Sequence, residues 1–230
     1  MCEQPHTKGA IFTDKMAGRY KYLDGNCYEQ VLANYSFFAA AYPMENKSIA
    51  GQGLREFITD FGVMDCLVCD RSKDQTSKGM DFTKEVQKHG IDLHVTDPYC
   101  RNQLKVEGVT REMRKKWFCV MLRKKSPHRL WDYILKWVAE IMQRTAGSAG
   151  SLHYRISLEE VTCETPVISE YLDFAFYDWC WYNNNAGLVG TKFWKMAGRI
   201  SLHQKSYVLL GPRRKWNVSF EDDRLQGYQY

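Results

Sequence analysis

The chain has 230 residues, of which 44% are hydrophobic, enough for one full core and a small appendage. Its 32 Lys and Arg against 27 Asp and Glu give a net charge of only +5, so the position of the basic residues matters more than their number. No apolar run approaches the roughly 20 residues that cross a bilayer, and the N-terminus lacks the apolar stretch of a signal peptide, which leads us to expect an intracellular chain with no membrane partner.

The first third of the chain predicts an antiparallel meander followed by a helix. Strands are expected over residues 9–16, 28–34 and 37–42, where apolar runs are separated by turn residues. Apolar residues at helical spacing then predict a helix with Ser48 as its N-cap and Gly62 at its end.

The middle third changes to alternating strands and helices. Residues 66–70 form a short apolar run ending in an acid, residues 82–89 have helical polarity, and residues 91–95 alternate like a strand. This order predicts parallel strands joined by helical crossovers. Two long amphipathic helices are expected next, over residues 102–125 and 129–145.

These elements divide the chain into three parts. We expect a compact core over residues 9–146, a connector over 147–168 that opens on a run of Gly, Ser and Ala, and a small β-rich C-terminal region over 169–230.

Eight cysteines raise the question of a disulfide or metal framework. Their positions show no repeated pairing, and Cys66 and Cys69, the one C-x-x-C pair, lie in a predicted strand with no second pair of ligands. Reduced thiols, several of them buried, are the favoured interpretation over a zinc or redox site.

Three acidic residues have placements that predict chemistry. Asp14 lies in the first strand, Asp70 ends a buried strand, and Glu107 lies near the start of a long helix. Ligand sites in open α/β sheets form beyond the carboxyl ends of the strands, and clustered carboxylates are stabilised by Mg²⁺ or Mn²⁺. Two such ions would support an in-line phosphoryl displacement. Acids at strand ends also cap turns, so the pattern alone leaves both interpretations open.

Longer motifs around these acids carry a family resemblance. The D, D, E signature of retroelement integrases is matched by residues 11–16, 67–70 and 98–108, with 36 residues between Asp70 and Glu107. Further similarity to copia-type elements lies in residues 131–133, 164–166 and 176–179. The chain thus resembles the integrase catalytic core of copia-type LTR retrotransposons over nearly its whole length.

The resemblance implies an RNase H-like fold, with a five-stranded mixed sheet flanked by helices and, beyond it, the β-rich appendage. It implies that Asp14, Asp70 and Glu107 bind two Mg²⁺ or Mn²⁺ ions and catalyse two reactions. Water first trims the DNA ends of the element, and the freed 3′-hydroxyl then attacks target DNA. It also implies DNA partners, a homo-oligomer and, for an active protein, a nuclear location.

Basic residues after Glu107 are candidate DNA contacts. Arg111 and Arg114 follow it by four and seven positions and therefore share its helix face. Together with Lys115, they predict a phosphate-binding surface, to which the motif adds Asn102, Gln103 and Lys105. The alternative is a solvated basic face, or an ion pair between Arg111 and Glu107.

Two other functions stay open. A ribonuclease H would use a further acid from the first helix, for which Glu56 is the candidate. A catalytically inactive remnant is the other alternative, because Ser72 and Arg101 stand where the family usually has glycine and proline. The zinc module of full integrases is not matched either, since only His6 precedes the core, which leads us to expect a fragment of a longer polyprotein.

Overall fold

The computed structural model describes most of the chain, namely residues 6–18, 25–77, 79–97, 106–146, 155–166, 168, 176–182, 192–201, 206–210, 215–219 and 225–227. Within these ranges, no helix is both long enough and apolar enough to cross a membrane.

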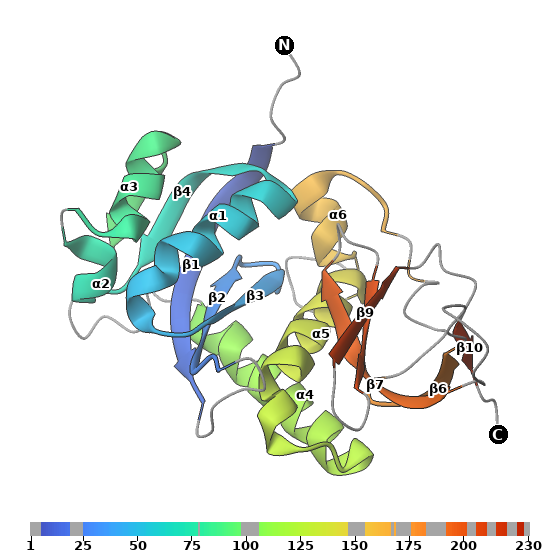
Figure 1. Ribbon diagram of the computed structural model, residues 1–230. Helices are drawn as coiled ribbons and strands as arrows, with labels where there is room; N and C mark the ends of the chain where they lie inside the picture. The colour runs from blue at the N-terminus through green and yellow to red at the C-terminus, as the bar shows by residue number, and fades with distance from the viewer. Residues whose placement is uncertain are drawn as a thin grey trace.

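A five-stranded mixed sheet forms the centre of the fold (Figure 1). Its strands are β1 (His6–Ala17), β2 (Tyr28–Ala33), β3 (Ala39–Met44), β4 (Val63–Cys69) and β5 (Asp92–Val95). They lie in the order β3-β2-β1-β4-β5. The first three pair antiparallel, whereas β4 is parallel to both β1 and β5. The predicted meander, parallel strands and five-stranded mixed sheet are therefore confirmed.

Helices cover both faces of this sheet. They are η1 (Lys47–Ile49), α1 (Ala50–Phe61), α2 (Lys73–Thr76), α3 (Asp81–Lys88), α4 (Val106–Lys124), η3 (His128–Leu130), α5 (Trp131–Arg144) and α6 (Ser157–Thr162). Side chains alternate between the two faces of a strand, so each strand serves two cores. On β1, Phe12 and Met16 pack with α4 and α5, whereas Ile11 packs with α1, α3 and α6.

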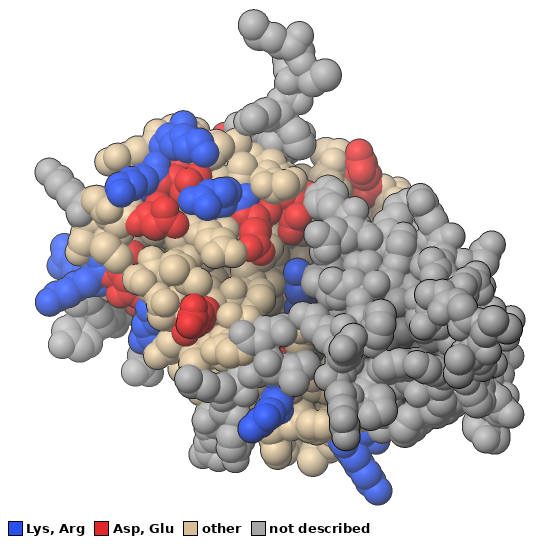
Figure 2. Space-filling view, in the orientation of Figure 1, with Lys and Arg blue, Asp and Glu red and all other residues tan. Residues whose placement is uncertain are grey.

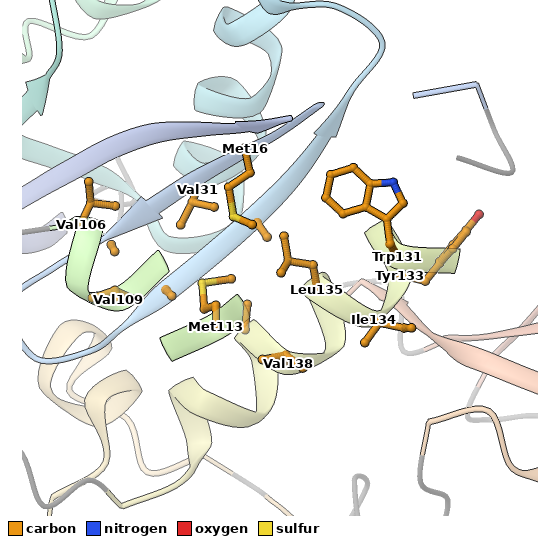
Figure 3. Packing of buried hydrophobic residues seen from close by; sticks show 14 of the residues in the cluster. Met16, Val31, Val106, Val109, Met113, Trp131, Tyr133, Ile134, Leu135 and Val138 are labelled. Carbon is orange, nitrogen blue, oxygen red and sulfur yellow. The ribbon is translucent and has the colours of Figure 1, made fainter. Parts of the chain in front are cut away.

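The core between the sheet, α4 and α5 holds the start of α4 in place. Figure 3 shows Met16 and Val31 of the sheet with Met113 of α4 and Leu135 of α5, all of them buried. Val106 and Val109 belong to the same cluster, as the helical periodicity predicts. The first turn of α4 is therefore anchored to the sheet beside β1, and the predicted start of this helix, over residues 102–105, lies outside the described residues.

The start of α1 differs from the prediction. Ser48 lies inside the short turn η1, which Asn46 caps by accepting a hydrogen bond from the Ser48 N–H at 3.1 Å. Helix α1 follows η1 directly after Ile49, which makes no side-chain capping bond. The predicted end is confirmed, because Gly62 has φ 91 and its N–H donates to the Ile58 carbonyl at 2.9 Å.

Helix α6 lies in the segment predicted as a connector. Its Leu158 and Val161 are buried in the core under α1, and α6 contacts both β1 and α5. The Ser157 hydroxyl donates to the Gln143 carbonyl at 3.3 Å. This segment is thus packed on the core, while the boundaries of the three predicted parts stay predictions.

A second sheet follows in the C-terminal region. Its strands are β6 (Trp179–Tyr182), β7 (Lys192–Ser201), β8 (Ser206–Leu210), β9 (Lys215–Ser219) and β10 (Leu225–Gly227). They pair antiparallel in the order β10-β6-β7-β8-β9, and β7 contacts α5. The region is therefore rich in β-structure, as predicted.

Two glycines give a matched test of helix packing. A Cβ at Gly51 in α1 would lie 2.6 Å from the backbone carbon of Asp81, whereas among the described residues no atom lies within 4 Å of a Cβ at Gly108 in α4. Gly51→Ala should therefore destabilise the fold by about 1 to 3 kcal/mol. Gly108→Ala should stabilise it by up to about 1 kcal/mol through helix propensity. Urea unfolding measures both, and a Gly51→Ala protein as stable as the parent would contradict the close approach of α1 to α3.

Candidate active site

The pairing of β1 with β4 brings Asp14 and Asp70 together. These strands run parallel, with Ile11 opposite Leu67 and Phe12 opposite Val68. Continuing this register by two residues places Asp14 opposite Asp70, just beyond the end of β4. Both side chains are partly exposed, so the two carboxylates lie at the edge of the sheet where a substrate can reach them.

Electrostatics shows that the third acid is near. Burial raises the pKa of Asp14, and the negative charges of Asp70 and Glu107 raise it further. A backbone hydrogen bond from Lys15 at 2.7 Å and the positive charge of Arg114 act in the opposite direction. The charges of Asp70, Glu107 and Arg114 are therefore all near enough to Asp14 to affect its pKa.

Lys15 joins the first acid to the loop after the second. Its side chain is only 8% exposed, and its ammonium group forms an ion pair with Asp74 and a 3.2 Å hydrogen bond to the Ser72 hydroxyl. Ser72 in turn donates its N–H to Asp70 at 3.3 Å. Partial burial acts to raise the pKa of Asp74, but the hydrogen bond and charge of Lys15 lower it, so the pKa of Asp74 lies below its usual value. A continuous chain of polar contacts thus connects the segments that carry Asp14 and Asp70.

Ser72 occupies a position where the integrases that the sequence resembles usually have glycine, and its backbone angles show why a side chain is tolerated there. Its φ of −73 and ψ of 140 are extended backbone angles that any residue adopts. Its hydroxyl also bonds the Gln75 side chain at 3.0 Å. The serine is therefore built into the loop, and this departure from the motif gives no support to a decayed site. Arg101, the other departure, lies outside the described residues.

The donor set suits a hard divalent cation. Carboxylate oxygens are the ligands that Mg²⁺ and Mn²⁺ prefer. The pKa of Asp14 is raised first by burial and then by the charges of Asp70 and Glu107, and a bound cation would oppose both effects. In the described part of the chain, however, no three acidic, histidine or cysteine side chains converge closely enough to hold one ion as they stand. Ion binding would therefore require the carboxylates to move closer together, and Glu107, which is exposed, has the freedom to do so.

Three of the six predicted DNA contacts lie in the described part of the chain. Arg111, Arg114 and Lys115 are all exposed on α4, and Lys115 also lies 3.6 Å from Glu112. The other predicted contacts, Asn102, Gln103 and Lys105, lie outside the described residues.

The surface over α1 and α3 carries both basic and acidic side chains. Figure 2 shows Lys and Arg side by side with Asp and Glu over α1 and α3. There Arg55 pairs with Glu85 at 2.8 Å, and Lys88 lies 3.5 Å from the same carboxylate. Since basic side chains there face acids, this surface is a poorer match for a DNA backbone than α4 is.

The cysteine pair has the properties of ordinary strand residues. Burial and the charge of Asp70 raise the pKa of Cys69 to about 12, and burial and nearby acids also raise the pKa of Cys66. Reactive thiols have lowered pKa values, so the reduced, unreactive interpretation from the sequence is supported.

Sequence reasoning missed Lys15, Asp74 and Gln75. Lys15 follows Asp14 directly inside an apolar strand, and a lysine in such a run is a signal for a buried partner. The identity of that partner is not encoded locally, because Asp74 is 59 residues away.

Asp14→Asn should stabilise the apo protein. The raised pKa means that the ionised form is disfavoured in the fold, so the destabilisation appears as pH rises above 3.8, the ordinary pKa, and is complete above the raised value. The gain in melting temperature should thus be clear at pH 7 and vanish near pH 3. An equal gain at both pH values would contradict a charge effect.

The Lys15–Asp74 pair can be tested by a double-mutant cycle. Lys15→Met should cost about 1 to 3 kcal/mol, because it leaves Asp74 and Ser72 without their donor. Adding Asp74→Asn should recover part of that loss, whereas Lys73→Met, an exposed change on α2, should cost little. Chemical denaturation gives the coupling, and strict additivity would show that the pair contributes nothing.

Comparison with family models and with curated proteins gives no match. Solved structures do match. The catalytic core domain of BIV integrase aligns with a TM-score of 0.50 and 15% identity, over 65% of this chain and 93% of that chain. A chain from the cryo-EM structure of the simian T-cell lymphotropic virus intasome, in complex with the PP2A regulatory subunit B56 gamma, aligns with a TM-score of 0.52 and 12% identity, over 99% of this chain and 84% of that one. The five-stranded mixed sheet flanked by helices is therefore the RNase H-like fold of retroviral integrase catalytic cores.

Proposed function

We propose that this chain is the catalytic core of a retroelement integrase of the copia type, which trims DNA ends and joins them to target DNA. The observation that carries the proposal is the parallel register of β1 with β4, which puts Asp14 opposite Asp70, and the charges of Asp70 and Glu107, which both act to raise the pKa of Asp14, support it. Asp14 and Asp70 lie at the same edge of the sheet, Glu107 lies in the first turn of α4, and the motifs around all three resemble those of integrases. The likeness of the fold to integrase cores supports the same assignment.

In this proposal the three acids would bind the metal ions, and Lys15 and Ser72 would hold two of these acids in position. Asp14, Asp70 and Glu107 would hold two Mg²⁺ or Mn²⁺ ions, which supply charge for activating the attacking oxygen and stabilising the leaving one. Asp14 keeps one carboxylate oxygen bonded to the Lys15 N–H, which fixes its orientation. Lys15 and Ser72 hold the Asp70 loop against β1 and so keep the two acids in register.

Helix α4 would carry the DNA. Arg111 and Arg114 lie one and two turns beyond Glu107, so a phosphate backbone bound along this face would run past the acids. Lys115 would add charge beside them, and Asn102, Gln103 and Lys105 belong to the same proposed surface. One of the similar structures is an intasome. By analogy, we propose that this chain forms a homo-oligomer on DNA and acts in the nucleus.

An inactive remnant is the second candidate. It is favoured by one observation, the absence of a converged ligand cluster in the described part of the chain. A ribonuclease H is less well supported: Glu56 lies on α1, which packs on the sheet face opposite α4, and the acids acting on Asp14 are Asp70 and Glu107.

A nicking and strand-transfer assay on short duplex DNA with Mg²⁺ or Mn²⁺ tests the proposal. Asp70→Asn and Glu107→Gln should each reduce product at least about 100-fold, because each removes a charged ligand that acts at the transition state. Glu112→Gln on α4 and Asp65→Asn on β4 are matched controls, since they remove one charge from the same elements away from the site, and both should retain activity.

The results of this assay distinguish an active integrase core from an inactive remnant. Product from the parent that persists in Glu107→Gln would contradict the carboxylate mechanism. No product from the parent, together with no stabilisation by Mn²⁺ in thermal unfolding, would establish the remnant.

A further inference from the structure

A short segment connects the core to the C-terminal sheet. It consists of Phe176, Tyr177 and Asp178, and β6 begins at the next residue, Trp179. Farther along the chain β7 contacts α5, so the second sheet lies against the core at that helix (Figure 1). We call these three residues the latch, since they lie where the chain passes from the core into the second sheet.

The hydrophobic half of the latch is Phe176. This residue is 1% exposed and belongs to the core cluster between the central sheet, α4 and α5. Its ring centroid lies 6.0 Å from that of Trp137 on α5 and 6.2 Å from that of Tyr177, whose ring stacks on it. A buried phenylalanine removes a large apolar area from water, so this half binds the segment firmly to the core.

The ionic half of the latch is Asp178. Its carboxylate lies 2.5 Å from the ammonium group of Lys124, the last residue of α4. The two side chains are 37% and 33% exposed, respectively. Water and salt screen ion pairs of such exposure, so these pairs contribute little to stability and open readily. The two halves of the latch therefore differ in strength, because Phe176 is held by burial and Asp178 by a weak pair.

The backbone between the two halves is strained. Tyr177 has φ 62, in the left-handed region that residues other than glycine rarely adopt. Such a conformation persists only where surrounding contacts impose it. Here the contacts on its two sides are the burial of Phe176 and the pair of Asp178 with Lys124. The strain therefore favours release of the weaker contact, which is the ion pair.

Lys124 is also the middle residue of three consecutive cations, with Arg123 before it and Lys125 after it. It lies about 25 Å along α4 from Glu107, which is less than one helical turn of duplex DNA. A DNA backbone presents several phosphates to such a run and gains free energy by releasing their counterions, and both effects favour it over one carboxylate. A phosphate at Lys124 would also repel Asp178.

We infer that the latch holds the C-terminal sheet against the core in the free protein, and that DNA opens its ionic half when a phosphate displaces Asp178 from Lys124. The inference rests on the proposed function and adds a regulation to it: DNA bound along α4 releases the chain at the entrance to the second sheet. Because DNA binds the open form, any change that raises the population of this form tightens DNA binding by the same factor.

Amide hydrogen exchange of the full chain in EDTA tests the inference without requiring catalysis. A duplex about three helical turns long should slow exchange in α4 and speed it in residues 176–182 by about 2- to 5-fold, the factor that corresponds to an ion pair of this exposure. Asp178→Asn should speed exchange in 176–182 by the same factor without DNA, and should tighten DNA binding by that factor.

Lys124→Met tests the other partner of the pair. It should also speed exchange in residues 176–182 without DNA, because Asp178 loses its cation. Unlike Asp178→Asn, it should lower the slope of log affinity against log salt by about 0.9, since one phosphate contact is lost.

Glu160→Gln is the matched control, since it removes one negative charge from an exposed position on α6. It should leave exchange in residues 176–182 unchanged and tighten DNA binding less than Asp178→Asn does. Melting temperatures verify that each variant is folded.

Unchanged exchange in residues 176–182 when DNA binds to a parent that is active in strand transfer would overturn the latch and leave the proposed function standing. Equal exchange in Asp178→Asn and Glu160→Gln would overturn it as well, because the ion pair would then hold nothing in place. A parent that binds no DNA would overturn both the latch and the proposed function.

Discussion

The parallel pairing of β1 with β4 is the constraint on which the site depends. Thr7 pairs with Met64 and Ala10 with Cys66, so β1 contains one extra residue between these pairs. Gly9, within this bulge, has φ 88. A shift of one residue turns every following side chain to the other face of the sheet. Without the bulge, Asp14 would face α1 and Lys15 would face α4.

The bulge therefore also decides how charge is distributed. With Asp14 facing α4, the positive charge of Arg114 acts on it from that side, while Lys15 pairs with Asp74 on the other. Like charges at close range destabilise a fold unless opposite charges are near. The two cations therefore act from opposite faces of the sheet, Arg114 on Asp14 and Lys15 on Asp74.

Much of this arrangement could be predicted from the sequence, because it depends on local patterns. The strand around Asp14, the strand ending at Asp70 and the buried face of the helix after Glu107 follow from alternation and helical spacing. The resemblance to integrases supplied the five-stranded mixed sheet, whereas the order of its strands came only from the structure.

What could not be predicted depends on contacts between distant residues. Nothing near Lys15 indicates that its partner lies in α2, and a four-residue helix is too short to show periodicity. Before α1, Asn46 and Ser48 are both residue types that cap helices, and the capping bond is made by Asn46 because the extra turn η1 precedes α1. The contact between Trp117 and Trp131 was missed for a similar reason: both are expected in a helical core, and their meeting depends on how α4 and α5 pack together.

Helix α6 has a consequence for how the core can be isolated. A fragment cut at residue 146, where a helix pattern ends, would remove Leu158 and Val161 from beneath α1 and expose the apolar surface that they cover. The bridge between Ala146 and Ile156 would be lost with them. Limited proteolysis should consequently leave a stable product whose C-terminus lies beyond Thr162. A core fragment for crystallisation should therefore include α6 and end after that residue.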